Sequence, residues 1–99
     1  MEAKTAKYRA YYVDGTTKDF QFDEEPSFKH LYEIIDTDMV QELPYTNYKM
    51  WCDEEGMLKN RELNESVDGR WAELSGGNYP DNFNACLGTA VELIDCEFE

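Results

Sequence analysis

Carboxylates are the most abundant reactive side chains of this chain, with 22 aspartates and glutamates against 9 lysines and arginines and a formal net charge of −13. Asp36 and Asp38 stand one residue apart, and Asp53, Glu54 and Glu55 are consecutive. Such oxygens bind Mg²⁺ or Ca²⁺, and paired carboxylates catalyse glycoside hydrolysis. Neither group fits a calcium-binding loop, and no two members are singled out. Solvated turns are therefore the simpler interpretation, with a small carboxylate-based hydrolase as an alternative.

Histidine and cysteine are too few and too scattered for the common catalytic and metal sites. His30 is the single histidine, and we expect it on the exposed side of a helix, away from the apolar stripe. Cys52, Cys86 and Cys96 lack the spacing of zinc ligands, so reduced thiols are the expected state. The chain also lacks a Gly-x-Ser-x-Gly nucleophile elbow and a phosphate-binding loop. We predict a protein that is not an enzyme and has neither a metal nor a cofactor.

A small group of cations interrupts the acidic sequence just before a predicted helix. The N-terminus of a helix beside lysine and arginine attracts anions, and tryptophan rings stack on nucleobases. One hypothesis is therefore a homodimer that binds a small nucleotide. The competing hypothesis is that the cations pair with nearby acids and that the tryptophans belong to the core. The residues of the nucleotide hypothesis are Lys59, Asn60, Arg61, Asn64, Trp51 and Trp71.

The acidic surplus itself predicts the kind of partner. A strongly negative surface repels nucleic acid and acidic membranes, and it attracts basic proteins. If the acids share one face, they imitate the phosphates of a nucleic acid and occupy a basic protein that binds nucleic acid. The competing interpretation is an acidic shell spread evenly for solubility. The residues predicted to contact the partner are Asp23, Glu24, Glu25, Asp53, Glu54 and Glu55.

These residues must be positioned by a central stretch that spans residues 48–74. Residues 48–52 are aromatic and apolar, as a half-buried strand requires. The acids that follow, with Gly56, predict a tight turn and a return strand at residues 57–58. A helix begins at Asn64 and ends at Gly76, and the stripe that includes Val67 and Trp71 gives it one apolar face.

The rest of the chain supplies further strands and one more helix. Residues 7–13 and 18–22 form a hairpin around Asp14-Gly15, and residues 39–43 and 85–98 are strands. Ser27 caps a helix in which Phe28, Leu31, Tyr32 and Ile35 form the apolar face, and Gly88 marks either a bulge or a close backbone approach. Together these elements predict one α+β domain over residues 1–99. Its mostly antiparallel sheet of about five to six strands carries two helices on one face.

Three motifs resemble an uncharacterised domain-of-unknown-function family of tailed phages and large algal DNA viruses. They are the hairpin DEEGMLK, the helix start LNE and the final CLGTAVEL, within residues 31–93. Met57 replaces the lysine usual in that hairpin, and residues 75–85 look like an enlarged loop. The resemblance carries no activity and implies a viral or phage accessory protein.

The combined hypothesis is a non-catalytic accessory protein that counters a host defence by occupying a basic host protein. Sequestration of a small nucleotide signal is the alternative. The first residues hold no apolar leader and no apolar run is long enough to cross a membrane, so the cytoplasm of the host cell is the expected location.

Overall fold

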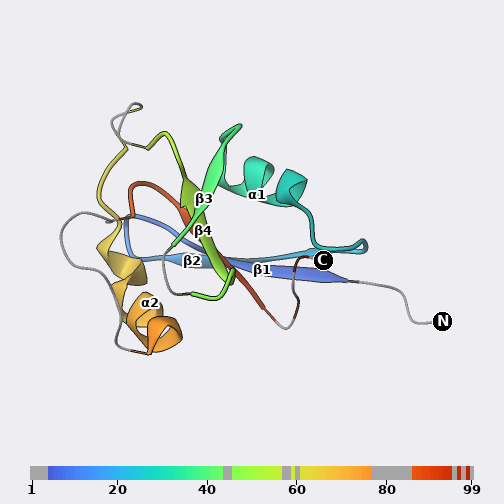
Figure 1. The fold of residues 1–99 in the computed structure, drawn as a ribbon. Coiled ribbons are helices and arrows are strands. Elements are labelled where there is room, and N and C mark those ends of the chain that lie inside the picture. Colours follow the sequence, from blue (N-terminus) through green and yellow to red (C-terminus); the bar gives the residue numbers. More distant parts are fainter. Residues whose placement is uncertain are drawn as a thin grey trace.

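The computed structural model describes residues 5–43, 46–56, 59, 61–76, 86–94, 96 and 98. Within them the chain forms a 5-stranded sheet in the order β2-β1-β5-β4-β3, and all neighbouring strands are antiparallel (Figure 1). This confirms the predicted α+β class. The elements are β1 (Ala6–Tyr11), β2 (Thr17–Phe22), α1 (Phe28–Ile35), β3 (Val40–Glu42), β4 (Met50–Asp53), the 3₁₀ turn η1 (Glu65–Val67), α2 (Asp68–Ser75) and β5 (Ala90–Leu93).

The β1–β2 hairpin closes at the predicted turn. Gly15 has a φ of +90°, a conformation that favours glycine, and its N–H donates to the carbonyl of Tyr12 at 3.0 Å. The carboxylate of Asp14 accepts hydrogen bonds from the N–H and the hydroxyl of Thr16. This local chemistry fixes the register of the two strands.

The central strand β4 has a neighbouring strand on each side. Its neighbours are β3, with Gln41 opposite Cys52, and β5, with Trp51 opposite Val91. The return strand predicted at residues 57–58 lies outside the described residues. β4 and β5 are buried along their whole lengths, which is typical of central strands covered on both faces.

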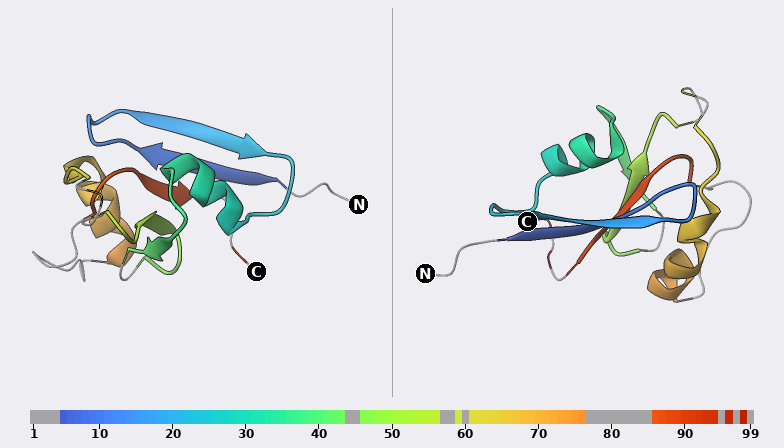
Figure 2. Two further views of the ribbon diagram at one scale, coloured as in Figure 1. Left: turned by 90° about the horizontal axis from the view of Figure 1, so that it is seen from above. Right: turned by 180° about the vertical axis from the view of Figure 1, so that it is seen from behind.

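The two helices cover opposite faces of the sheet, so the prediction of a single helical face is wrong (Figure 2). Leu31 of α1 packs in one core cluster with Tyr8 and Val91. Trp71 of α2 packs in the other cluster with Tyr11 and Ala90. Successive side chains of a strand point to opposite faces. The alternation along β1 and β5 therefore feeds two cores, one on each face.

Helix α1 starts and stops as its sequence indicates. The hydroxyl of Ser27 accepts from the N–H of Lys29 at 3.2 Å, and Asp36 ends the helix with a left-handed φ of 64°. Only Leu31 and Ile35 of its apolar residues are fully buried. The helix therefore contacts the sheet through a narrow apolar stripe, and much of its surface is exposed to solvent.

Candidate binding face

Asp53, predicted to contact a partner, is buried at the end of β4 and its side chain has no exposed surface. One carboxylate oxygen accepts from the hydroxyl of Thr37 and from the N–H of Glu55, each at 2.8 Å. The other accepts from Nζ of Lys59 at 3.2 Å and from Nε of Arg61 at 2.6 Å. Asp53 is therefore an internal anchor, and its assignment to the surface is corrected.

The protonation state of Asp53 follows from these contacts. Burial by itself raises the pKa of a carboxyl group, because it disfavours the charged form. Here the backbone N–H of Glu55, and then Thr37, Lys59 and Arg61, more than offset burial and hold the pKa of Asp53 below its usual value. The carboxylate is thus ionised at neutral pH and keeps both cations beside it.

The cations predicted to bind a nucleotide instead make contacts inside the protein. Besides Asp53, Arg61 donates from Nη2 to the carbonyl of Asp36 at 2.7 Å. Its aliphatic stem lies against Gly88, where an added Cβ would fall 2.6 Å from the Cδ of Arg61. Gly88 has a φ of +83°, so the close approach predicted at this glycine is confirmed. Asn60, the third member of the group, lies outside the described residues.

Asn64 is a buried cap that also ties three segments together. Its side-chain oxygen accepts from the N–H of Ser66 at 3.1 Å, which confirms the predicted N-cap. Its side-chain N–H groups donate to the carbonyls of Tyr11 at 2.7 Å and Gly88 at 2.8 Å. Both polar atoms of its side chain are thereby engaged inside the protein, and neither is directed to a ligand.

The two tryptophans are core residues, as the competing hypothesis held. Trp71 is 1% exposed and packs under α2, and Trp51 is 8% exposed and faces α1. A base cannot stack on rings that are covered in this way. Among the described residues, the nucleotide site predicted around residues 59–64 is therefore not assembled.

The remaining predicted acids lie at the two ends of α1. Residues 23–38 carry six carboxylates and one lysine, Lys29, and all six carboxylates are exposed. Glu54 joins them, because its N–H donates to the carbonyl of Met39 at 3.0 Å, just beyond α1. Glu55 is half-buried, so we do not count it among the exposed acids. We call the exposed set the acidic rim: Asp23, Glu24, Glu25, Glu33, Asp36, Asp38 and Glu54.

Part of the acidic rim surrounds a shallow hollow at the C-terminal end of α1. The hollow has a volume of about 430 Å³. A helix C-terminus carries partial negative charge, so acids there are unfavourable for the helix. Lys59, the one cation of the lining, is already bound to Asp53. The hollow is thus strongly negative for reasons that helix stability does not explain. It is lined by Tyr32, Glu33, Asp36, Thr37, Asp38 and Lys59.

Exposed aromatic rings accompany the acidic rim, although the sequence predicted them to be buried. Phe28 is 41% exposed and Tyr32 is 39% exposed. The ring of Phe28 packs edge-on against Trp51 at 5.1 Å and stacks on Phe98 at 4.6 Å between ring centres. Tyr48, 64% exposed, stacks on Trp51 at 6.4 Å. We call Phe28, Tyr48, Trp51 and Phe98 the aromatic end.

His30 is buried, so its predicted place on the surface is wrong. Its ring stacks on Phe22 at 3.9 Å, and Nε2 lies 2.6 Å from a carboxylate oxygen of Glu24. Nδ1 lies 2.7 Å from the hydroxyl of Tyr8, which accepts from the N–H of Ser27. An ionised glutamate only accepts, so Nε2 of His30 donates to Glu24. The His30 contact lowers the pKa of Glu24, and it fixes one end of the acidic rim.

The α2 face holds a second buried carboxylate, Glu92, which the sequence analysis did not single out. Arg70 donates to Glu92 from Nε at 3.0 Å and from Nη2 at 2.7 Å, and the hydroxyl of Tyr11 donates at 2.6 Å. The hydrogen bond to Glu92 is the main cause that raises the pKa of Arg70. The only sequence signal was a charged residue inside the apolar run of residues 90–93.

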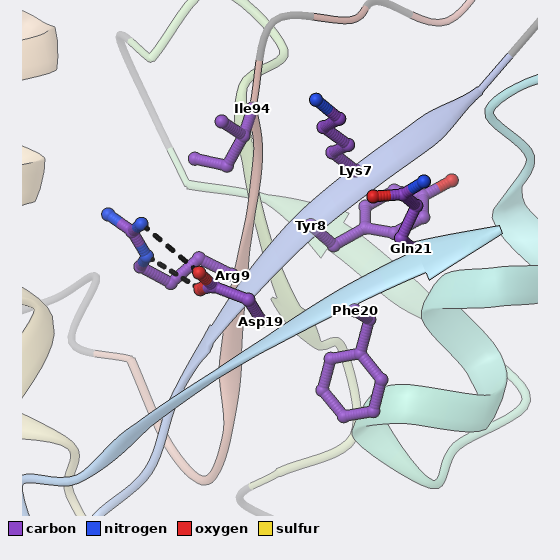
Figure 3. Close-up of a pocket in the computed structure, with 7 residues that line it drawn as sticks. All are labelled: Lys7, Tyr8, Arg9, Asp19, Phe20, Gln21 and Ile94. Atoms are coloured by element: carbon purple, nitrogen blue, oxygen red, sulfur yellow. Dashed lines mark hydrogen bonds and ion pairs between the residues drawn. The ribbon is translucent and has the colours of Figure 1, made fainter.

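A further hollow of about 380 Å³ lies on the part of the α2 face formed by β1 and β2 (Figure 3). Arg9 spans it and donates from Nε to Asp19 at 2.8 Å. Figure 3 shows Lys7 and Ile94 on the same side, whereas Phe20 points to the other side of the strand, toward α1. Because its arginine is already paired with an exposed aspartate, this hollow is weakly charged compared with the acidic rim.

Comparisons with known proteins add no relative. No family model, no curated protein and no solved structure matches this chain. In the part of the chain that the structure describes, no helix is long and apolar enough to cross a membrane. The same residues contain no group of three or more histidines, cysteines or acids placed to hold a metal ion.

Proposed function

We propose that this protein is a non-catalytic binding protein that occupies a basic partner protein through its acidic rim. The observation that carries the proposal is the charge around α1. Five acids of the rim form no ion pair with any described cation: Asp23, Glu33, Asp36, Asp38 and Glu54.

The placement of these acids supports binding over simple solubility. The described basic side chains of β1, β2 and α2 include Arg9 and Arg70, and both are paired with acids of the α2 face. Glu33, Asp36 and Asp38 lie at the C-terminal end of α1, where they oppose the helix dipole. These acids neither stabilise the helix nor form ion pairs. Residues that break the local rules of stability in this way are expected at functional surfaces.

The length of the acidic rim also suits an extended basic surface. Eight residues of α-helix span about 12 Å, with acids at both ends. Proteins that bind nucleic acid present basic side chains along a comparable path to meet successive phosphates. We therefore propose a basic, nucleic-acid-binding protein as the partner. That the partner belongs to a host cell, and that the role is counter-defence, rests on the viral resemblance alone.

The alternative functions have less support. Lys59 and Arg61 of the nucleotide hypothesis are committed to Asp53, and both tryptophans are covered. For the hydrolase hypothesis, Glu33, Asp36 and Asp38 share an open hollow that does not exclude water, and enclosure is what strengthens acid–base chemistry. Neither alternative explains why the acids surround α1.

A charge-matched pair of variants tests the proposed function with a fluorescent octalysine peptide as the probe. The rim variant carries Glu33→Gln, Asp36→Asn and Asp38→Asn. The control carries Glu62→Gln, Glu65→Gln and Glu73→Gln, which removes equal charge elsewhere. We expect the rim variant to bind octalysine at least tenfold more weakly than the control, and added salt to weaken wild-type binding steeply. Equal binding by the two variants would refute the proposal.

A further inference from the structure

Most of the exposed apolar side chains in the described part of the chain lie on or near α1, as the acidic rim does. Five large hydrophobic residues of the described part are well exposed. Two of them belong to α1, Met39 lies four residues after its last residue, and Tyr48 stacks on Trp51, the residue that packs against Phe28. Scattered exposed apolar residues are ordinary, but a contiguous group rimmed by polar residues marks an interaction site. The five are Phe28, Tyr32, Met39, Tyr48 and Leu63.

The backbone holds the most exposed ring of this group in an unfavourable conformation. Asn47 and Tyr48 have φ angles of 56° and 62°, in the left-handed region that side chains larger than glycine rarely adopt. The carboxylate of Glu42 accepts from the N–H of Tyr48, and Nε1 of Trp51 donates to its carbonyl at 3.0 Å. Strain of this kind persists where the surroundings enforce it, and it concentrates at functional sites.

The chemistry of the group indicates what it binds. In the described part of the chain a cation lies over one ring, where Nζ of Lys18 is 5.1 Å from the centre of Phe20. Phe28 and Tyr48 carry no such intramolecular cation there, and three acids of the rim lie three to five residues before Phe28. A guanidinium is the group that both stacks on an aromatic face and pairs in a bidentate way with a carboxylate.

We infer that the aromatic end docks an arginine-rich segment of the basic partner, with guanidinium groups stacked on Phe28 and Tyr48 and paired with the acidic rim. This inference rests on the proposed function and specifies its chemistry: arginine is selected over lysine. A hollow of about 130 Å³ beside Tyr48 and Phe98 offers room next to the rings. Lys49 also lines it, and its Nζ donates to the carbonyl of Cys96 at 2.9 Å.

The test compares octa-arginine with octalysine at equal ionic strength, by titration of the wild type and three variants. Phe28→Leu keeps apolar bulk without a ring, and Tyr48→Asn keeps a residue that tolerates the left-handed backbone. Leu63→Ala removes an equally exposed apolar residue outside α1 and is the control. We expect the wild type to prefer octa-arginine by about threefold to tenfold, the range of one or two cation–π contacts. Phe28→Leu and Tyr48→Asn should abolish that preference, and Leu63→Ala should keep it.

The outcomes separate this inference from the proposed function. If both peptides bind equally to the wild type, or if the preference survives in Phe28→Leu and Tyr48→Asn, the inference is overturned while the acidic rim still stands. If neither peptide binds, both fail. If the wild type self-associates and the two ring variants do not, a second copy of this chain occupies the aromatic end, and the inference is again overturned. Unchanged circular dichroism spectra of the variants exclude unfolding as the cause.

Discussion

Among the described residues, each face of the sheet buries one carboxylate, and the two are stabilised by different means. On the α1 face, Asp53 is held by two cations, a threonine and a backbone N–H. On the α2 face, Glu92 is held by Arg70 and by the hydroxyl of Tyr11. The α1 face carries the acidic rim in addition. Folding accounts for the two buried acids and their arginines, but it does not account for the rim, which is why we assign the rim to binding.

The largest effect is expected at Glu92, because its charge depends on one cation. Arg70→Met keeps the apolar stem and removes the guanidinium, which leaves a buried carboxylate with only Tyr11 as a donor. Loss of one partner of a buried ion pair costs about 3–5 kcal/mol. Denaturant unfolding of the variant measures this loss. A cost below 1 kcal/mol, as at a surface pair, would contradict the importance given to this contact.

A smaller loss of stability is expected when the arginine beside Asp53, on the α1 face, is replaced by methionine. Arg61→Met leaves Asp53 with Lys59, Thr37 and the N–H of Glu55. We expect a loss of about 1–3 kcal/mol in the free energy of unfolding, the range for a hydrogen bond to a charged group. The comparison is sharpened by the double variant Lys59→Met/Arg61→Met, whose loss should approach that of Arg70→Met. If Arg61→Met alone equals Arg70→Met, the redundancy inferred at Asp53 is wrong.

Alkaline pH should lower the free energy of unfolding, because each face of the sheet holds one buried tyrosine that resists ionisation. Burial is the main cause that raises the pKa of Tyr8 and of Tyr11 from 10.0 to about 12, and the hydrogen bond to Glu92 adds to it at Tyr11. The folded protein therefore holds both phenolic protons more tightly than the unfolded chain does. This stability is complete below pH 10 and is lost as the pH rises to about 12.

Unfolding curves at a series of pH values test this dependence. The loss between pH 10 and about 12 should shrink in Tyr8→Phe and in Tyr11→Phe, and it should shrink most in the double variant. Titration of the phenols by ultraviolet absorbance gives an independent measure. If the free energy of unfolding of the double variant falls with pH as steeply as that of the wild type, other groups cause the alkaline loss.

The smallest effect is expected from acids at helix ends, where the sign of the change in stability depends on which end carries the acid. Asp36 lies at the C-terminus of α1, where the helix dipole disfavours an anion, whereas Asp68 lies in the first turn of α2, where the dipole favours one. Asp36→Asn should raise the melting temperature and Asp68→Asn should lower it, each by the equivalent of about 0.3–1 kcal/mol. Effects of the same sign would show that the acids at the end of α1 are not opposed by the helix.

Much of the fold was accessible from local sequence, because caps and turns depend on a few neighbouring residues. Ser27, Asn64 and Gly76 mark helix boundaries where they were predicted, and Asp14-Gly15 closes the first hairpin. The pairing of β4 was not accessible. A short buried strand carries no mark of which strands lie beside it, and the insertion of β5 between β1 and β4 joins segments far apart in the chain.

The sequence by itself determined the α+β class and the negative surplus. Tertiary structure alone decided which of the charged residues are internal. Asp53 sits on the sheet side that faces α1 and meets Arg61, whereas Glu54, its direct neighbour, turns to solvent. Asp53 is the last residue of β4 and Glu54 lies in the turn that follows, so packing covers the first and leaves the second exposed. Composition therefore predicts the charge of a surface, but only three-dimensional packing selects the residues that form it.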